Sequence, residues 1–508
     1  MTTGIDLGHW FAARTVRSNT RIALTFEGIS YTYAGLQQRI DRVAAGLRSH
    51  GITPGDRVAF LGANQPAFFE VLLASARVGA TFVPLNTRLT GPELAFIVAD
   101  ATPRVLIADT AHVPVVATIR DEFDDVDCVH VESTQSGWGS YEALAATAGS
   151  LDSATTVDPD DTAIIMYTSG TTGRPKGVML SHANLWWNNI NLLGQFDVLE
   201  DDITLVVAPL FHIAGLNVTT FTTWMKGGHV LLHRQFDPNV VLEDIEKYSV
   251  TTMFGVPAMF TALDLHPRFE SADLSTLRLV ICGGAPSPEP LLRRYADRGI
   301  GMMQGYGLTE SSPSATFLGA EHALSKLGSA GKPPLYTQVK LLGGDGVAVT
   351  TALDRGEICL RGPNITTGYW NRPDATAEAI DADGWFHTGD VGYFDTDGFL
   401  FVVDRIKDMI ITGGENVYPA EVESVLYGHP DITEVAVVGL PDERWGEAVT
   451  AILALREGAA LSLEGLRDFG GATLARYKLP TRMYRSDALP RNPSGKILKN
   501  ELRSHYGA

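Results

Sequence analysis

The feature that most constrains the fold of this 508-residue chain is an alternation of short apolar runs with segments of helix length. Residues 55–62 have the pattern of a strand, residues 66–79 that of a helix, and residues 80–86 that of a second strand. This order predicts a βαβ unit with parallel strands. Comparable apolar runs occupy residues 104–110, 162–168, 202–209, 229–233 and 277–284. We therefore predict an α/β fold with mainly parallel sheets flanked by helices.

The last third of the chain has a different texture. Short β runs at residues 339–349, 356–362 and 399–405 are punctuated by Asp-Gly pairs and predict hairpins. Asp395, Asp397 and Gly398 superficially resemble a calcium loop, but the later oxygen ligands of such a loop are missing, so a turn is favoured.

A helix signal at Pro419, a stop at Gly428 and two further β runs then predict a small α+β domain. We place the division between a large domain, residues 1–404, and a small domain, residues 405–508.

Charge and cysteine usage restrict the partners. The chain has 59 acidic against 40 basic residues, a net charge of −19, which disfavours nucleic acids and anionic membranes. No stretch has the length of a membrane span, and the N-terminal residues lack the apolar core of a signal peptide. Cys128, Cys282 and Cys359 are scattered without a CxxC pair, which favours a reducing cytoplasm. The sequence does not fix the oligomeric state, and a homodimer is one of the possibilities.

The strongest local motif is YTSGTTGRPKG, residues 167–177, which directly follows an apolar run. Glycines permit close backbone approach to a ligand, hydroxyl groups donate hydrogen bonds, and a lysine supplies positive charge, so the segment suits a polyphosphate. Pro175 distinguishes it from a Walker A loop. The alternative is an ordinary polar surface connection. The candidate ligand-binding residues are Thr168, Ser169, Gly170, Thr171, Thr172, Gly173 and Lys176.

A second motif is QGYGLTE, residues 304–310. Tyr306 offers a ring that can stack on a base, Thr309 a hydroxyl for a phosphate, and Glu310 an oxygen ligand for Mg²⁺. Alone, the motif is weak, because glycine-flanked tyrosines are usually packing residues.

Together with WFHTGD (385–390), DRIKDMIITGGENVYPAEVE (404–423) and PRNPSGKILK (490–499), these motifs have the order and spacing of adenylate-forming enzymes. The chain resembles the acyl- and aryl-CoA synthetase branch of that superfamily over essentially its whole length. The resemblance implies a two-step reaction. A carboxylate attacks the α-phosphorus of ATP to give an acyl-adenylate and pyrophosphate, and a thiol then takes the acyl group and releases AMP.

The resemblance also implies roles for individual residues. Asp390 matches the carboxylate that binds the ribose hydroxyls, Arg405 a second nucleotide contact, and Glu310 with Thr168 the magnesium ligands. Lys496 matches the catalytic lysine that bridges the substrate carboxylate and the α-phosphate, and Lys176 a lysine at the phosphates. The implied nucleotide contacts further include Gly284, Ala285, Pro286, Gln304, Gly305, Tyr306, Gly307 and Thr309.

For the thiol step, the resemblance places a domain hinge at Lys407 and the pantetheine tunnel at Gly413 and Gly414. Arg476 and Lys478 match basic residues near the phosphates of CoA. ATP, Mg²⁺ and CoA are therefore the expected cofactors and co-substrates.

For the acid, His212 matches a residue that gates the path between thiol and adenylate. Ala214 stands where hydroxycinnamate ligases commonly carry an aromatic ring, a departure that argues against a coumarate-like substrate and for a roomier pocket. Ile411 stands where some aryl ligases have a lysine near the nucleotide, so that nucleotide contact is expected to be missing. We expect a medium-chain or aromatic carboxylic acid.

Alternative functions stay open at this point. The acceptor could be a carrier-protein thiol or an amine, the oxyanion could be nitrite activated toward an aryl amine, or the chain could be a silent regulatory subunit. Serine hydrolase, zinc protease and dinucleotide-binding signatures are absent from the sequence.

Overall fold

Two compact units make up the chain. Met1–Val339 together with Leu360–Phe386 form unit 1, and Lys340–Cys359 together with His387–Ala508 form unit 2. The domain division at residues 404 and 405 stays a prediction. The computed structural model describes residues 4–123, 125–132, 137–147, 155–168, 174–405, 408–413, 415–491 and 497–507.

The first large sheet of unit 1 has the strand order β15-β14-β13-β12-β10-β11-β1-β2. Its central neighbours β14/β13, β13/β12, β12/β10, β10/β11 and β11/β1 are all parallel, and only the two edge pairs are antiparallel. The predicted α/β class is thus confirmed. The strands are β1 (Ile22–Phe26), β2 (Ile29–Thr32), β10 (Ile203–Val206), β11 (His229–Leu232), β12 (Thr252–Gly255), β13 (Leu279–Gly283), β14 (Met302–Gly307) and β15 (Ser314–Leu318).

The second large sheet of unit 1 has the order β19-β9-β8-β4-β3-β5-β6-β7. From β8 to β7 neighbouring strands are parallel, whereas β9 pairs antiparallel with both β8 and β19. The strands are β3 (Arg57–Leu61), β4 (Thr81–Leu85), β5 (Val105–Asp109), β6 (Asp127–Val131), β7 (Gly139–Ser140), β8 (Thr162–Thr168), β9 (Lys176–Ser181) and β19 (Gly368–Tyr369).

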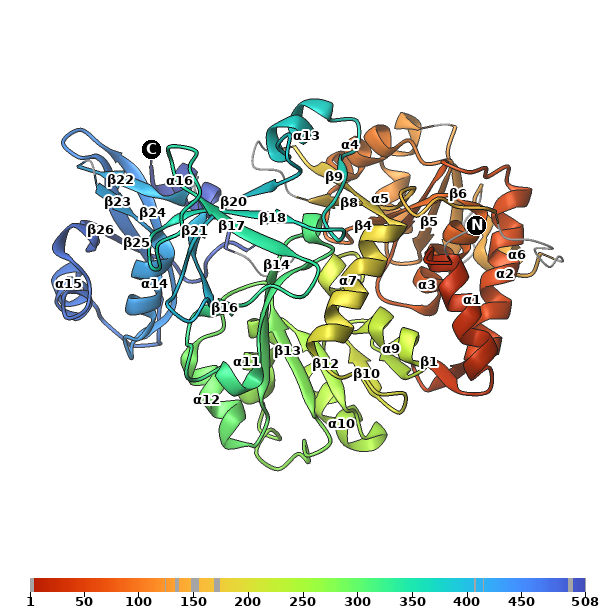
Figure 1. Cartoon of the computed structure of the whole chain (residues 1–508), viewed down its shortest axis with the longest axis horizontal. Helices are drawn as coiled ribbons and strands as arrows, with labels where there is room; N and C mark the ends of the chain where they lie inside the picture. The colour runs from red at the N-terminus through yellow and green to blue at the C-terminus, as the bar shows by residue number, and fades with distance from the viewer. Residues whose placement is uncertain are drawn as a thin grey trace. The chain divides into compact units, whose positions relative to one another are not determined.

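Helices cover both sheets because each presents an apolar stripe to them. On α10, for example, Val241, Leu242 and Ile245 are buried and join a core that includes Leu205 of β10 and Met253 of β12. Figure 1 shows α10, α11 and α12 beside this part of the first sheet. The main helices of unit 1 are α1 (Leu7–Ser18), α2 (Tyr33–Ser49), α3 (Pro66–Val78), α4 (Gly91–Ala101), α7 (His182–Gln195), α9 (Thr220–Lys226), α10 (Pro238–Tyr248), α11 (Pro257–Asp264), α12 (Glu289–Asp297) and α13 (Pro373–Ala379). None of the helices within the described residues is long and apolar enough to cross a membrane.

Unit 2 contains the α+β block expected near the C-terminus. The sheet of this C-terminal block has the order β23-β22-β25-β24, and β26 pairs in parallel with β25. The helix predicted to begin at Pro419 does so and ends at Tyr427. The elements are β22 (Ile410–Thr412), β23 (Glu415–Val417), α14 (Pro419–Tyr427), β24 (Ile432–Asp442), β25 (Gly446–Leu455), α15 (Leu463–Gly471), β26 (Arg482–Arg485) and α16 (Lys499–Tyr506).

A hairpin of β20 (Phe386–Phe394) and β21 (Leu400–Arg405) precedes that block. At its tip, the Asp395 carboxylate accepts hydrogen bonds from the backbone N–H groups of Asp397 and Phe399. Gly398 has φ +77°, which suits a left-handed turn position. The tip is therefore the Asp-Gly turn favoured from the sequence.

One buried ionic cluster ties α2 to α3 and α6 (Tyr141–Ala145). The Glu70 side chain is fully buried, and its carboxylate accepts two hydrogen bonds from Arg39, of 2.6 and 3.1 Å, and one of 2.6 Å from the Tyr141 hydroxyl. Burial and the adjacent Glu70 carboxylate raise the pKa of Tyr141, so the phenol stays protonated and donates. The charge of Glu70 is thus compensated on both sides.

Replacing Glu70 by alanine should destabilise unit 1 by about 3–5 kcal/mol, because Arg39 would keep its charge without its buried partner. Tyr141→Phe removes one hydrogen bond and should cost about 1–2 kcal/mol. Urea unfolding monitored by circular dichroism measures both. Equal midpoints for the wild-type chain and Glu70→Ala would contradict a stabilising role for the cluster.

Candidate active site

The first large sheet gathers several of the predicted residues at one edge. Because β10, β12, β13 and β14 are parallel neighbours, their carboxyl ends lie side by side, which is where open α/β sheets bind ligands. His212 follows β10, Gly284 follows β13, and Thr309 with Glu310 follows β14 in a 3₁₀ turn. Segments that are about 100 residues apart in sequence thus meet at one edge.

Two glycines at this edge have different structural reasons. Gly284 has φ +84°, and a Cβ there would have only a Val256 methyl group nearby at 3.5 Å, so backbone conformation rather than crowding favours glycine. A Cβ on Gly307 would lie 1.7 Å from the Pro313 carbonyl oxygen. Packing inside the protein therefore requires a glycine at position 307. The sequence pattern had attributed this glycine to contact with a ligand.

The edge also holds buried nitrogen atoms that lack partners. His212 Nε2 and Gln304 Nε2 have no hydrogen-bond partner among the described residues. Burial, and secondarily the charge of Arg88, lowers the pKa of His212 to about 4, so its imidazole is neutral near pH 7. Since buried polar groups are usually satisfied, these atoms suit a site whose ligand completes the bonding.

The β8–β9 hairpin positions the polyphosphate motif. Thr168 pairs with Lys176 in the antiparallel register, and the Thr168 hydroxyl donates to the Lys176 carbonyl at 3.5 Å. The motif thus leaves the sheet at the carboxyl end of β8. Of the residues predicted here, Ser169, Gly170, Thr171, Thr172 and Gly173 lie outside the described residues.

Lys176 and Glu310 are linked through a residue that the sequence pattern did not single out, Tyr369 of β19. The Lys176 ammonium lies 4.7 Å from the centroid of the Tyr369 ring, a cation–π distance. The Tyr369 hydroxyl donates to Glu310 Oε1 at 2.8 Å. Burial and the Glu310 carboxylate raise the pKa of Tyr369, so the phenol keeps the proton that it donates. The available signal was the Gly-Tyr-Trp run at residues 368–370, which carries no chemistry by itself.

In unit 2, the hairpin brings Asp390 and Arg405 together. They occupy paired positions of β20 and β21, and Arg405 Nε lies 3.3 Å from Asp390 Oδ1. The Asp390 backbone N–H donates to the Thr388 hydroxyl, which itself donates to the Ile358 carbonyl. Two residues predicted to contact one nucleotide are therefore neighbours.

Two of the residues assigned to the thiol step, Lys478 and Gly413, contact other side chains of the protein. Lys478 forms a 2.5 Å ion pair with Glu421, so it would have to exchange partners to bind a phosphate, whereas Arg476 is exposed. Gly413, at φ +60°, packs against Trp445, whose ring a Cβ would approach to 2.9 Å. Lys407, Gly414 and Lys496 lie outside the described residues.

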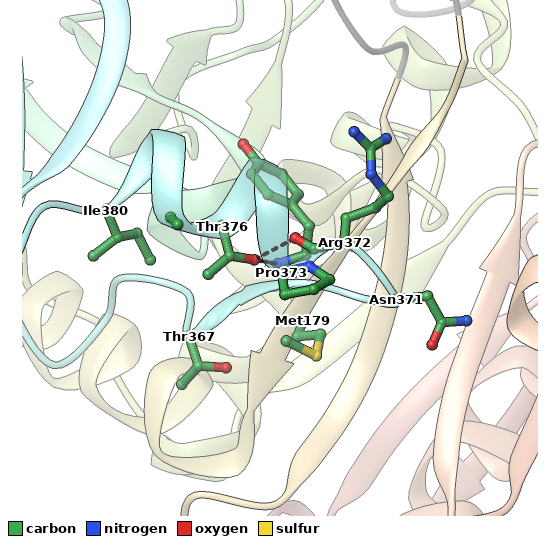
Figure 2. A pocket seen from close by; sticks show the side chains of 9 residues that line it. Met179, Thr367, Asn371, Arg372, Pro373, Thr376 and Ile380 are labelled. Atoms are coloured by element: carbon green, nitrogen blue, oxygen red, sulfur yellow. Dashed lines mark hydrogen bonds between the residues drawn. The ribbon is translucent and has the colours of Figure 1, made fainter.

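A cavity of about 480 Å³ lies in unit 1 between β9, β19 and the start of α13. Figure 2 shows its lining, in which Met179, Pro373 and Ile380 are apolar and Arg372 carries the charge. That charge is paired with Asp374 at 2.7 Å. None of the residues predicted from the sequence lines this cavity, but Tyr369 does, and Tyr369 also contacts Lys176 and Glu310. The cavity therefore adjoins the candidate nucleotide site.

Comparison with known proteins gives a consistent result. The model of the AMP-binding enzyme family matches residues 11–370, and that of the AMP-binding enzyme C-terminal domain matches residues 421–496. Feruloyl-CoA synthase of Amycolatopsis sp is 46% identical over 507 residues, 99% of each chain. Indoleacetate–CoA ligase of Aromatoleum aromaticum is 40% identical over 500 residues, 98% of each chain.

Among solved structures, o-succinylbenzoate CoA synthetase from Bacillus subtilis, in complex with the acyl-adenylate intermediate OSB-AMP, superposes with a TM-score of 0.87. It is 34% identical, and the match covers 97% of each chain. The chain therefore belongs to the AMP-binding enzyme family, within its acyl- and aryl-CoA ligase branch.

Proposed function

We propose that the chain is an AMP-forming acid–CoA ligase that prefers an aromatic carboxylic acid, with medium-chain acids as the second class. The observation that carries the proposal is the gathering of His212, Gly284 and the Thr309–Glu310 turn at one sheet edge, next to apolar side chains. In the first step a carboxylate oxygen bonds to the α-phosphorus and pyrophosphate leaves. In the second, the CoA sulfur bonds to the acyl carbon and AMP leaves.

The nucleotide is held in this proposal by short-range donors and cations, against the overall negative charge. The 168–176 segment surrounds the β- and γ-phosphates, residues 284–286 and Tyr306 contact the adenine, and Asp390 accepts hydrogen bonds from the ribose hydroxyls. Arg405 then has a second task besides pairing with Asp390. It can neutralise the carboxylate until the ribose arrives, or contact the nucleotide itself.

Magnesium fits the donor set at Glu310. The Glu310 carboxylate, whose Oε1 accepts the bond from Tyr369, and the Thr168 hydroxyl offer oxygen ligands of the kind that Mg²⁺ prefers. When bound, the ion would neutralise charge on the departing pyrophosphate. Tyr369 acts as a positioning residue because it contacts both Lys176 and Glu310 through different parts of one side chain.

Lys496 and the domain division 1–404/405–508 complete the proposal. A cation between two anions lowers their repulsion and orients the nucleophile, so Lys496 serves adenylation. Rotation of the small domain at Lys407 would then withdraw Lys496 and place Gly413 and Gly414 at the thiol tunnel. Arg476 and Lys478 would then lie near the CoA phosphates. The three cysteines are buried and form no disulfide, which suits a cytoplasmic location. The alternatives kept with this proposal are a homodimer as the assembly and a carrier-protein thiol in place of CoA.

The preference for an aromatic acid is supported by the relatives named for ferulate and indoleacetate. Ala214 supports a pocket roomier than that of hydroxycinnamate ligases. Ala214 is half-buried against a cluster that contains Phe254, Met303 and Phe317. A small side chain beside these rings leaves room for a flat substrate, and each methylene-sized change in such a pocket is worth about 1–3 kcal/mol.

An acid panel tests the substrate class. Ferulate, 4-coumarate, indoleacetate, octanoate, palmitate and nitrite, each with ATP and Mg²⁺, should give CoA-dependent AMP release with highest kcat/KM for an aromatic acid. Ala214→Phe should lower kcat/KM for that acid at least 10-fold and leave the KM for ATP nearly unchanged. AMP release at the full rate without CoA and without thioester would refute the ligase proposal, and a preference for palmitate would refute the acid class.

Lys496→Ala separates the two steps. Acid-dependent exchange between pyrophosphate and ATP should fall by about 100- to 1000-fold, because charge at the α-phosphorus loses its cation, while thioester formation from preformed acyl-adenylate is largely retained. The control is Lys247→Ala, a change at an exposed lysine of α10. Equal losses in both steps would argue against assigning Lys496 to adenylation alone.

Tyr369→Phe keeps the ring over Lys176 and removes the hydrogen bond to Glu310. Adenylation should fall about 10-fold and need a higher Mg²⁺ concentration, since a hydrogen bond to a charged group contributes roughly 1.5–3 kcal/mol. Tyr369→Leu should be worse because it also removes the ring contact with Lys176. Tyr427→Phe, at an exposed position, serves as the matched control. An unchanged Mg²⁺ requirement in Tyr369→Phe would show that Tyr369 only packs.

A further inference from the structure

A cluster of metal-binding side chains in unit 2 has no part in the proposed reaction. The ligand atoms of Glu357, Cys359 and His387 all lie within 4.8 Å of one another. Glu357 and Cys359 are two residues apart on β18 (Gly356–Arg361), so they share one face, and His387 comes from the neighbouring strand β20. It is the only such cluster of three within the described residues.

The distances suit a small tetrahedral site. His387 Nδ1 lies 2.8 Å from Glu357 Oε2 and 3.7 Å from Cys359 Sγ. Around Zn²⁺, with its usual bond lengths, a histidine nitrogen and a cysteine sulfur are separated by about 3.5 Å, and a nitrogen and an oxygen by about 3.3 Å. The sulfur and nitrogen are thus almost in place, and the His387–Glu357 contact needs to open by only about half an ångström.

The burial of the three side chains also suits a metal site. Cys359 is fully buried at 0% exposure, whereas the side chains of His387 and Glu357 are 25% and 19% exposed, which leaves a path for an ion and for a water as fourth ligand. The second carboxylate oxygen, Glu357 Oε1, accepts the Gly389 backbone N–H at 3.1 Å. Such outer hydrogen bonds orient ligating carboxylates in metal sites.

We propose that Glu357, Cys359 and His387 form a binding site for a borderline transition metal ion of the Zn²⁺ class, separate from the magnesium of the reaction. One thiolate, one imidazole and one carboxylate select Zn²⁺, Co²⁺ or Cu²⁺ over Mg²⁺, which prefers oxygen ligands. The thiol releases its proton on binding, and the carboxylate and thiolate charges together balance those of the ion.

The site has a consequence for catalysis, which rests on the proposed role of Asp390. Glu357 holds the N–H of Gly389, the residue directly before Asp390. A metal that draws the Glu357 carboxylate toward Cys359 would shift this turn. We expect Zn²⁺ to inhibit adenylation reversibly, with restoration by a chelator.

Cobalt titration of the tag-free chain tests binding directly. One equivalent of Co²⁺ should produce a thiolate-to-cobalt charge-transfer band and the visible bands of a tetrahedral ion, both displaced by Zn²⁺. Cys359→Ala and Cys359→Ser should abolish the charge-transfer band, and Glu357→Gln should weaken binding about 10-fold or more. Cys128→Ala and Cys282→Ala, which alter the other buried cysteines, should keep it.

No band at saturating Co²⁺, or a band that survives in both folded Cys359 variants, would overturn the proposal. Zn²⁺ inhibition is then measured at constant excess of Mg²⁺ and ATP. Cys359→Ala should keep the basal rate and lose the inhibition. Cobalt binding without inhibition would keep the metal site but reject its link to the Asp390 turn, so the two inferences fail separately.

Discussion

The parallel pairing of β10, β12, β13 and β14 is the constraint on which the candidate site depends. Each pair is in regular register, so the four strands end together, and each chain segment that follows must begin at the same sheet edge. No single segment carries enough chemistry to activate an acid. The neutral His212, the left-handed Gly284 and the acidic Glu310 become one site only through these backbone hydrogen bonds.

A second constraint is electrostatic. A chain with a net charge of −19 gains no long-range attraction for a polyanion, so affinity has to come from groups a few ångströms away. The structure holds its relevant cations in defined surroundings: Lys176 over an aromatic ring, Arg405 beside a carboxylate and Lys478 in an ion pair. Because these side chains are already held in place, less side-chain entropy is lost when a ligand binds. Those held by a carboxylate have to exchange that carboxylate for the ligand.

Much of the fold was predictable because its signals are local. Apolar runs predicted the parallel strands, and Pro419, expected near the first turn of a helix, is the first residue of α14. Asp390 and Arg405, predicted from motifs, became neighbours through a hairpin whose turn was also predicted. Tyr369 was out of reach, because its role depends on β19 pairing with β9, far away in sequence. The glycines show the converse limit. Gly307 and Gly413 matched motif positions attributed to ligands, yet their immediate need for glycine comes from Pro313 and Trp445.

The hairpin register between Thr168 and Lys176 limits how this protein can change in length. Side chains alternate between the faces of a strand, so deletion of a single residue within β9 would either turn Lys176 away from Tyr369 or reverse the facing of the side chains that follow the deletion. An insertion within either strand would disturb the pairing in the same way. The span from β8 to β9 therefore couples the geometry of the proposed phosphate-binding segment to the packing of a core sheet, so a change in the length of one strand also disturbs the other.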